Sequence, residues 1–187
     1  MLELSEFAKN FNGLAVPNEL TKLLEFQNEV SKDDFYSDGF ELTVDTEKIG
    51  LKTYSEDEIF LNSIMEFANA DYTGSTYGFW LRNGNKNLSE TPIVAFGSEG
   101  GFHIIAENIK ELLQVLTFDS EPMIDWDEVS FYKSEDYEPR RFAEVYKDWL
   151  AEKFDLQPVE NPNFLIEKAQ NKYQAEFQKW MSRYYSE

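Results

Sequence analysis

The stretch STYGFWLRNGNKNLSETPIVAFGSEGGFHII, residues 75–105, decides the fold because turn residues divide it into three short apolar segments. Residues 77–81, 93–96 and 102–105 are too short for helices and are rich in aromatic and β-branched side chains, which is typical of strands. Asn83-Gly84 lies between the first two segments and is a strong hairpin signal, because both central residues of a type I′ turn need a positive φ. The sequence therefore predicts a three-stranded antiparallel meander.

The residues on either side of this stretch add strands and helices. Phe40, Leu42 and Val44 alternate with polar residues, which predicts a half-buried strand, and the second half of residues 59–67 is predicted to be another. Helices are predicted over residues 2–11, 18–29 and 108–116, and a turn is predicted over residues 32–39. The expected fold is α+β, an antiparallel β-sheet meander of about four to six strands packed with helices.

The last third of the chain is predicted to be helical. One helix is expected to open at Glu138-Pro139 and run to about residue 154, and another to open at Asn161-Pro162 and run to about residue 185. Along the last helix, apolar side chains recur every three or four residues, so this stripe could dock on the same domain or on another protein. Packing within the domain is the more common outcome. We therefore expect a single domain over residues 1–187, with residues 119–187 as a mainly helical carboxy-terminal extension.

The charge balance favours a basic protein partner. Asp and Glu number 36 against 17 Lys and Arg, for a formal net charge of −19 at pH 7. Contact with phosphate backbones needs clustered Lys and Arg, so the chain is not expected to bind nucleic acid. An acidic surface accelerates encounter with a basic protein by electrostatic steering. The alternative is that the charge only keeps the protein soluble.

The residue inventory excludes several kinds of catalytic site. The chain has no cysteine and a single histidine, His103, so thiolate chemistry, a metal site and a Ser–His–Asp relay are not expected. Neighbouring acids at residues 125–128 and 135–136 leave a carboxylate-based enzyme acting on a small substrate as an alternative. No cofactor is expected. The sequence has neither a secretory signal at its amino terminus nor an apolar run of about 18 residues, so the expected location is the cytoplasm.

Two glycine-containing loops, residues 72–76 and 97–101, invite comparison with phosphate-binding loops. A phosphate-binding loop presents backbone N–H groups at the start of a helix and usually carries a lysine. Both loops lack lysine and lead into predicted strands, and Glu99 would place a carboxylate where a phosphate should lie. Both loops are therefore predicted to be turns.

The central elements follow one another in a definite order. The pattern comprises a strand ending in Asp71, the Gly/Ser loop, the aromatic strand, Pro92-Ile-Val-Ala-Phe96, a Gly-Glu-Gly turn, and Ile105-Ala-Glu-Asn108 before a helix. This order resembles the SUKH superfamily, which joins cell-wall-synthesis regulators of fungi with toxin-immunity proteins of bacteria. Pro17-Asn-Glu-Leu20 is similar to the family's opening Pro-x-x-Leu helix. The similarity covers a SUKH-like core at residues 14–118 and consists of strand and turn patterns. Residues 119–187 lie outside it.

The resemblance implies a non-catalytic binding role. It implies an immunity protein that binds and neutralises a bacterial toxin, such as a nuclease, and the partner would be a basic toxin domain. The alternative of the same class is a regulatory or signalling adaptor of the cell-wall-synthesis regulator type. The family has no agreed catalytic set, so no catalytic residue is carried over to this chain.

Seven residues at or near the meander are candidates for the partner-binding surface. Acidic and aromatic side chains together suit a basic partner, because interfaces favour Tyr and Trp as anchors. The candidates are Glu56, Asp57, Glu58, Asp71, Tyr72, Glu99 and His103. Each one alone is explained by an ordinary structural role, such as a packed loop residue, a strand side chain facing a neighbour or a solvated turn. As a set they predict the surface, and neutralising residues 56–58 together is expected to slow association without affecting folding.

Overall fold

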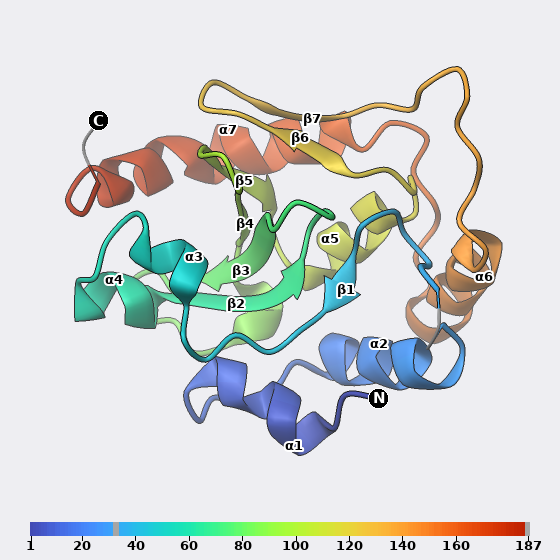
Figure 1. The fold of residues 1–187 in the computed structure, drawn as a ribbon, viewed down its shortest axis with the longest axis horizontal. Helices are drawn as coiled ribbons and strands as arrows, with labels where there is room; N and C mark the ends of the chain where they lie inside the picture. Colours follow the sequence, from blue (N-terminus) through green and yellow to red (C-terminus); the bar gives the residue numbers. More distant parts are fainter. Residues whose placement is uncertain (32–33, 186–187) are drawn as a thin grey trace.

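A five-stranded antiparallel meander forms the centre of the computed structural model, which describes residues 1–31 and 34–185 (Figure 1). The strands pair in the order β1-β2-β3-β4-β5, so each strand lies beside the next one in the chain. They are β1 (Glu41–Leu42), β2 (Ile64–Asn69), β3 (Thr76–Trp80), β4 (Ile93–Phe96) and β5 (Phe102–Ala106). The predicted α+β meander is confirmed. Lys32 and Asp33, in the predicted turn, lie outside the described residues.

The turns between the strands follow from local chemistry. Asn83 and Gly84 have φ values of 55° and 69°, as the predicted turn between β3 and β4 requires. Between β2 and β3, one carboxylate oxygen of Asp71 accepts hydrogen bonds from the backbone N–H groups of Thr73, Gly74 and Ser75, at 2.8–2.9 Å. The loop's own acid therefore occupies the position that a phosphate would need, and the loop is a turn.

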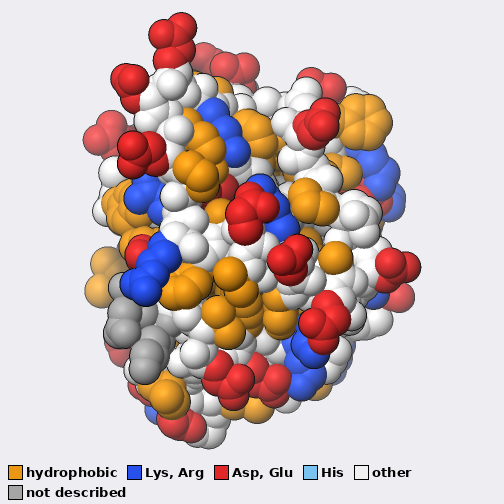
Figure 2. Space-filling view, turned by 90° about the vertical axis from the view of Figure 1, so that its right-hand side faces the viewer, with side chains coloured by type: hydrophobic (Ala, Val, Ile, Leu, Met, Phe, Trp, Pro, Cys, Tyr) orange, Lys and Arg blue, Asp and Glu red, His pale blue; other side chains and the backbone are white. Residues whose placement is uncertain are grey.

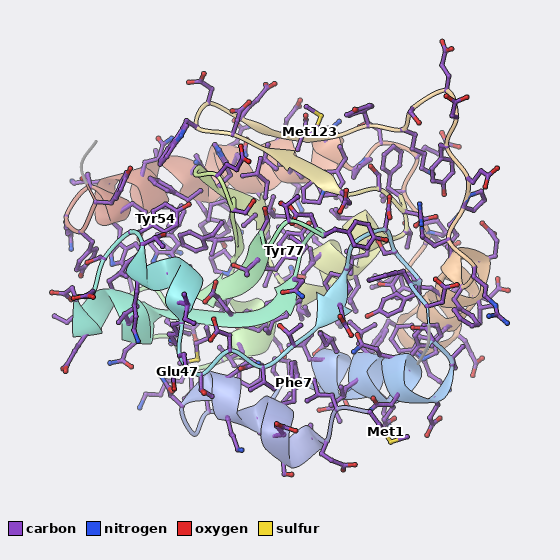
Figure 3. All side chains as sticks on the ribbon, viewed as in Figure 1. Met1, Phe7, Glu47, Tyr54, Tyr77 and Met123 are labelled. Carbon is purple, nitrogen blue, oxygen red and sulfur yellow. The ribbon has the colours of Figure 1, made fainter. Side chains whose placement is uncertain are left out.

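One face of the sheet is covered by helices from the first two thirds of the chain. These are α1 (Leu4–Phe7), η1 (Ala8–Phe11), α2 (Asn18–Glu29) and α5 (Ile109–Leu116), with a short 3₁₀ turn η2 (Leu88–Glu90) nearby. Tyr77, Phe79, Ile93 and Ala95 point from β3 and β4 into this core, where Figure 3 labels Tyr77. Asn108 begins α5 because its side chain accepts a hydrogen bond from the Glu111 N–H at 3.1 Å.

The opposite face of the sheet is covered by the long carboxy-terminal helix α7 (Asn163–Met181). Trp80, Val94 and Ile104 alternate with the residues of the first core and pack with Phe177 and Met181 of α7 in a second core. The short helices α3 (Ile49–Lys52) and α4 (Glu58–Ser63) complete this side. The predicted apolar stripe thus packs on the chain's own sheet, and α7 forms a layer of the same structure.

Side-chain amides cap the sheet edges. The amide of Gln27 accepts from the Leu42 N–H at 2.9 Å and donates to the Leu42 carbonyl at 3.3 Å, at the edge strand β1. At the other edge, Gln174 accepts from the Ile104 N–H and Gln170 donates to the Ile104 carbonyl, at 2.8 and 3.2 Å. An unpaired strand edge is a template for pairing with another chain. The glutamine side chains therefore satisfy the backbone N–H and carbonyl groups of Leu42 and Ile104, which a further strand would otherwise pair with.

The predicted helices of the carboxy-terminal extension are present, but two parts of the extension differ from the prediction. Residues 122–131 form a hairpin of β6 (Pro122–Ile124) and β7 (Val129–Phe131), which was not expected. The helix expected from Glu138-Pro139 is α6 (Ala143–Phe154) and begins later. Before α6, the Asp119 carboxylate accepts a hydrogen bond from the Arg140 N–H at 2.9 Å, which fixes the chain just ahead of the helix.

Candidate protein-binding surface

The β6–β7 hairpin is made by a short acidic sequence. Residues 119–138 contain eight acids and one lysine. Pro122, Val129 and Phe131 point inward, and the Asp125 carboxylate closes the turn by accepting from the N–H groups of Asp127 and Glu128, both at 2.8 Å. These hydrogen bonds, from Glu128 first and Asp127 second, lower the pKa of Asp125. The hairpin is therefore built by the same acids that charge its surface.

The hairpin docks on the turn between β4 and β5. His103 of β5 is 3% exposed, and its Nε2 lies 2.7 Å from the Asp125 carbonyl oxygen. Because a carbonyl only accepts, Nε2 carries the ring proton in this contact. Gly100 lies under the Trp126 indole, and Gly101 lies against the Asp125 backbone. The hairpin position depends on the absence of a side chain at these two glycines.

Replacing Gly101 with alanine is expected to displace the hairpin. Gly101 has a φ of +85°, and a Cβ there would lie 2.0 Å from the Asp125 carbonyl oxygen. We expect a loss of about 2 kcal/mol in the free energy of unfolding, made up of left-handed strain and the displacement. Gly84→Ala is the matched control, since Gly84 has a φ of +69° and open space around its Cβ position. Equal losses for the two variants, measured by urea denaturation, would contradict the docking contact.

Four large side chains stand exposed on and beside the hairpin. Met123, Trp126 and Tyr132 of the hairpin segment are 52%, 46% and 60% exposed, and Tyr72 is 56% exposed. Met123 and Tyr132 line one cavity of about 420 Å³ together with Glu121, and Figure 3 places Met123 on the outside of the hairpin. We call these four side chains, with the seven acids of residues 121–138, the hairpin surface. Exposed aromatics beside acids suit a basic protein partner.

Asp119 connects the segments under this surface. It is 1% exposed, and its carboxylate accepts from the Asp38 N–H at 3.0 Å, the Tyr137 hydroxyl at 2.5 Å and the Arg140 N–H at 2.9 Å. Burial and the bond to Asp119 raise the pKa of Tyr137. Arg140 also contacts the Asp38 carboxylate at 3.2 Å. One buried acid thus joins the loop before β1 to the segment that follows the hairpin.

The predicted residues Asp71 and Tyr72 belong to this surface. The Tyr72 N–H donates to Glu121 at 2.7 Å, and the Tyr72 hydroxyl donates to Asp38 at 3.0 Å. Burial, followed by the bond to Asp38, raises the pKa of Tyr72. Partial burial would raise the pKa of Asp71, but the hydrogen bonds from Ser75 and Thr73 outweigh it and lower that pKa. Asp71 therefore holds the turn that positions Tyr72.

The other five predicted residues divide into two groups. Glu99 lies exposed in the β4–β5 turn, where the adjacent Ser98 contacts Thr73 at 2.8 Å, so Glu99 lies close to the Asp71 turn. His103 is buried beneath the hairpin. Its ring can therefore affect partner binding by holding the hairpin in place through the hydrogen bond to the Asp125 carbonyl. Glu56, Asp57 and Glu58 are exposed at the start of α4, away from the hairpin (Figure 1). Asp57 also caps α4, by accepting from the Ile59 N–H at 2.8 Å.

Sequence reasoning missed Met123, Trp126 and Tyr132. The available signal was the pattern Pro122-Met-Ile124 and Val129-Ser-Phe131 around an acidic turn, which reads as two very short strands. In the sequence, the acids at residues 125–128 and 135–136 indicate only the alternative of a carboxylate-based enzyme. Figure 2 shows acidic side chains spread over the face on the α6 side, with hydrophobic side chains exposed between them. The distribution of acids therefore does not identify the hairpin as a binding surface. The solvent exposure of its large apolar and aromatic side chains is needed to identify it.

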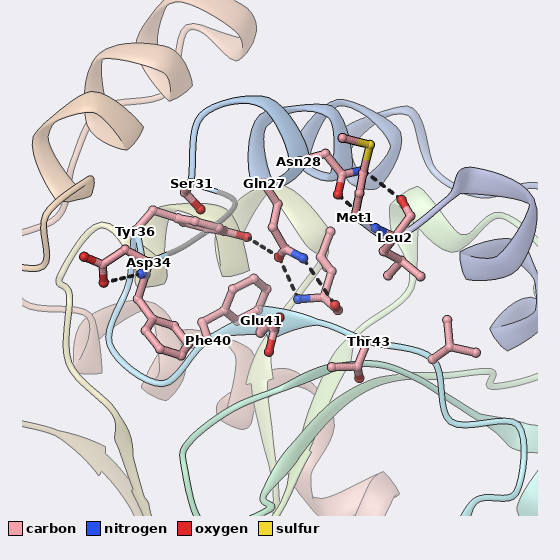
Figure 4. Close-up of a pocket in the computed structure, with 13 residues that line it drawn as sticks. Met1, Leu2, Gln27, Asn28, Ser31, Asp34, Tyr36, Phe40, Glu41 and Thr43 are labelled. Atoms are coloured by element: carbon pink, nitrogen blue, oxygen red, sulfur yellow. Dashed lines mark hydrogen bonds between the residues drawn. The ribbon is translucent and has the colours of Figure 1, made fainter.

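A second cavity, of about 540 Å³, lies between the amino terminus, α2 and β1 (Figure 4). Its amide side chains are engaged with the backbone, since Gln27 caps Leu42 and Asn28 bonds both the N–H and the carbonyl of Leu2, at 3.0 and 2.7 Å. Residues 1–31 and 34–185 contain no group of three or more His, Cys, Asp or Glu side chains placed to hold a metal ion. No helix in these ranges is long and apolar enough to cross a membrane.

No known protein family, curated protein or solved structure matches this chain. The resemblance to the SUKH superfamily therefore stays a prediction that rests on the sequence pattern of residues 14–118.

Proposed function

We propose that this protein is a non-catalytic binding module that neutralises a basic toxin domain, in the manner of a bacterial immunity protein. The observation that carries the proposal is the hairpin surface, on which four large exposed side chains adjoin seven acids and a single lysine. Aromatic side chains supply contact area at the centre of an interface, and acids around them attract and orient a positively charged partner. The SUKH-like pattern supports the same function.

The test starts with the product of the gene immediately upstream of this chain's gene. Expressed alone in bacteria, that product is expected to arrest growth, and co-expression of this chain is expected to restore it. A variant with Met123, Trp126 and Tyr132 changed to alanine should protect much less. A growth-arresting product that binds the chain without loss of its toxicity would contradict neutralisation and support the adaptor alternative.

Charge on the hairpin surface is expected to control the association rate. Asp127→Asn, Glu128→Gln and Glu135→Gln remove three exposed acids together. We expect association with the upstream product to slow about tenfold at low salt, with little change in dissociation, because exposed charges act mainly on encounter and are screened beyond about 8 Å at physiological salt. Stopped-flow or surface plasmon resonance at several salt concentrations measures both rates.

The matched control neutralises the acids at the start of α4. Glu56→Gln, Asp57→Asn and Glu58→Gln remove the same charge, and Asn at position 57 keeps the cap of α4. We expect this triple to slow association less than the hairpin triple. The opposite order would place the partner at α4, and an association rate independent of salt would assign the net charge to solubility.

A further inference from the structure

We propose that a small aromatic cavity at the tip of the β6–β7 hairpin binds one arginine side chain of the basic partner; this inference rests on the proposed function. The cavity has a volume of about 230 Å³ and is lined by Phe102, His103, Trp126, Gln178, Ser182 and Tyr185. Small-molecule sites occupy roughly 300–1,000 Å³, so this cavity is nearer to the size of a single side chain. It lies where β5, the hairpin and the end of α7 meet.

The aromatic rings of the cavity are arranged around one another. Trp126 and Tyr185 are stacked, with ring centroids 5.7 Å apart and planes 10° apart. Phe102 lies edge-on to both rings, at 6.3 Å from Trp126 and 6.1 Å from Tyr185. The faces of aromatic rings carry negative partial charge and attract cations, and a planar guanidinium can also stack on them. Trp126 is 46% exposed, so part of its ring is accessible to a partner.

The polar groups of the cavity also suit a donor-rich ligand. Both ring nitrogens of His103 are engaged within the chain, because Nε2 donates to the Asp125 carbonyl and Nδ1 lies 3.5 Å from the Gln174 amide nitrogen, so the polar groups open to a ligand come from the end of α7. Gln178 and Ser182 add an amide oxygen and a hydroxyl oxygen from α7. Arginine has five N–H donors and no acceptor, which matches such oxygens.

The surrounding charge favours a cation. Asp125, Asp127 and Glu128 are exposed in the turn that contains Trp126. Among the described residues, neither lysine nor arginine lines the cavity. A positively charged side chain would therefore enter between aromatic rings and acids, and it would meet no cation among the described lining residues. Arginine is preferred to lysine because lysine has a compact, strongly hydrated charge that cannot stack.

Two peptides of equal charge test the inference. One is a twelve-residue peptide of alternating Arg and Gly, and the other is the same peptide with Lys. We expect the Arg peptide to shift the indole N–H signal of Trp126 in ¹H–¹⁵N spectra, assigned with Trp126→Phe, and to bind about tenfold more tightly than the Lys peptide. Trp126→Ala should abolish this preference. Phe164→Ala should retain it, because Phe164 is an aromatic side chain of α7 that is 68% exposed and lies outside the cavity and the hairpin surface.

The possible failures can be told apart. Equal affinities for the two peptides, without a shift of the Trp126 signal, would overturn the arginine site while the basic partner of the proposed function stands. Binding of neither peptide at low salt would overturn the site and the acid-driven encounter together. A preference for Arg that survives Trp126→Ala would place the arginine elsewhere on the surface.

Discussion

Asp119→Ala is expected to lower the free energy of unfolding by about 4 kcal/mol. The variant leaves three donors, the Asp38 N–H, the Arg140 N–H and the Tyr137 hydroxyl, without the acceptor they have now. Leaving a buried donor unpaired costs about 1–3 kcal/mol, and water entering the adjacent cavity recovers part of the sum. Asp119 also has a φ of +56°, a conformation that alanine adopts less readily. Urea denaturation measures the loss.

Two further variants define the cause of this loss. Asp136→Ala removes an exposed acid that lines the same cavity and should change stability by less than about 0.5 kcal/mol. Asp119→Asn keeps one accepting oxygen and the tolerance for positive φ, so about half of the loss is expected. If Asp119→Ala were as mild as Asp136→Ala, Asp119 would not be the connection between the loop before β1 and the segment after the hairpin.

The same connection links stability to the proposed function. Asp38, which bonds Asp119 through its N–H, accepts a hydrogen bond from the Tyr72 hydroxyl and contacts Arg140. Loss of the Asp119 carboxylate therefore removes support from both sides of the hairpin surface. An interface anchor binds well when its position is fixed before the partner arrives. Asp119 is in this sense a positioning residue for the surface and not a contact residue.

The sheet could be predicted from sequence because its signals are local. Residues 77–81 and 93–96 are apolar segments on either side of Asn83-Gly84, and this turn forms through the backbone of its own two residues. Asn108 likewise caps α5 from within the same turn of chain. Each signal lies within a few residues of the turn or helix that it specifies, so these elements can be predicted from short segments of sequence.

The hairpin and the start of α6 could not be predicted in this way. β6 and β7 have three residues each, which is too short to show a periodicity, and the hairpin is held by His103, more than 20 residues away. The chain just before α6 is likewise fixed by Asp119, which accepts a hydrogen bond from the N–H of Arg140, 21 residues further along the chain. The amide caps of Gln27 and Gln174 also depend on which strand lies next to which helix. Such long-range contacts leave no pattern in one sequence.

The candidate site was predicted only in part for a related reason. Acids are visible in a sequence, but a sequence does not distinguish an exposed aromatic from a buried one. Tyr77 and Tyr72 are five residues apart, yet Tyr77 is fully buried and Tyr72 is 56% exposed. Likewise, the sequence does not distinguish Asp57 from its acidic neighbours Glu56 and Glu58. In the structure, the Asp57 carboxylate caps α4.

A second large effect concerns Glu66, a buried acid in β2 on the face covered by α7. It is 4% exposed; one carboxylate oxygen accepts from the Thr76 hydroxyl at 2.5 Å, and the other has no hydrogen-bond partner among residues 1–31 and 34–185. Burial, and to a smaller extent the charge of Asp45, raise the pKa of Glu66 from its ordinary 4.5 to about 7, although the Thr76 hydrogen bond and the charge of Lys48 offset part of this rise. Folding therefore favours the protonated acid.

This shift predicts how stability depends on pH. Because the pKa of Glu66 is higher in the folded than in the unfolded state, its contribution is fully present below about pH 4.5 and is lost as the pH rises through 7. At about 1.4 kcal/mol per pKa unit, the ionised side chain lowers the free energy of unfolding by about 3 kcal/mol at pH 8. Burial of a charge next to an unpaired oxygen is the physical cause.

Glu66→Gln should remove this pH dependence, because glutamine has the shape of the protonated acid, keeps an acceptor for Thr76 and does not ionise. We expect the variant to be more stable than the wild type by about 1 kcal/mol at pH 5 and by about 3 kcal/mol at pH 8, measured by urea denaturation at both values. Glu58→Gln, at an exposed position in α4, is the control and should leave the difference between the two pH values unchanged. A Glu66→Gln protein that gains no stability relative to the wild type between pH 5 and pH 8 would show that Lys48 compensates the buried charge, and that Glu66 is ionised throughout this range.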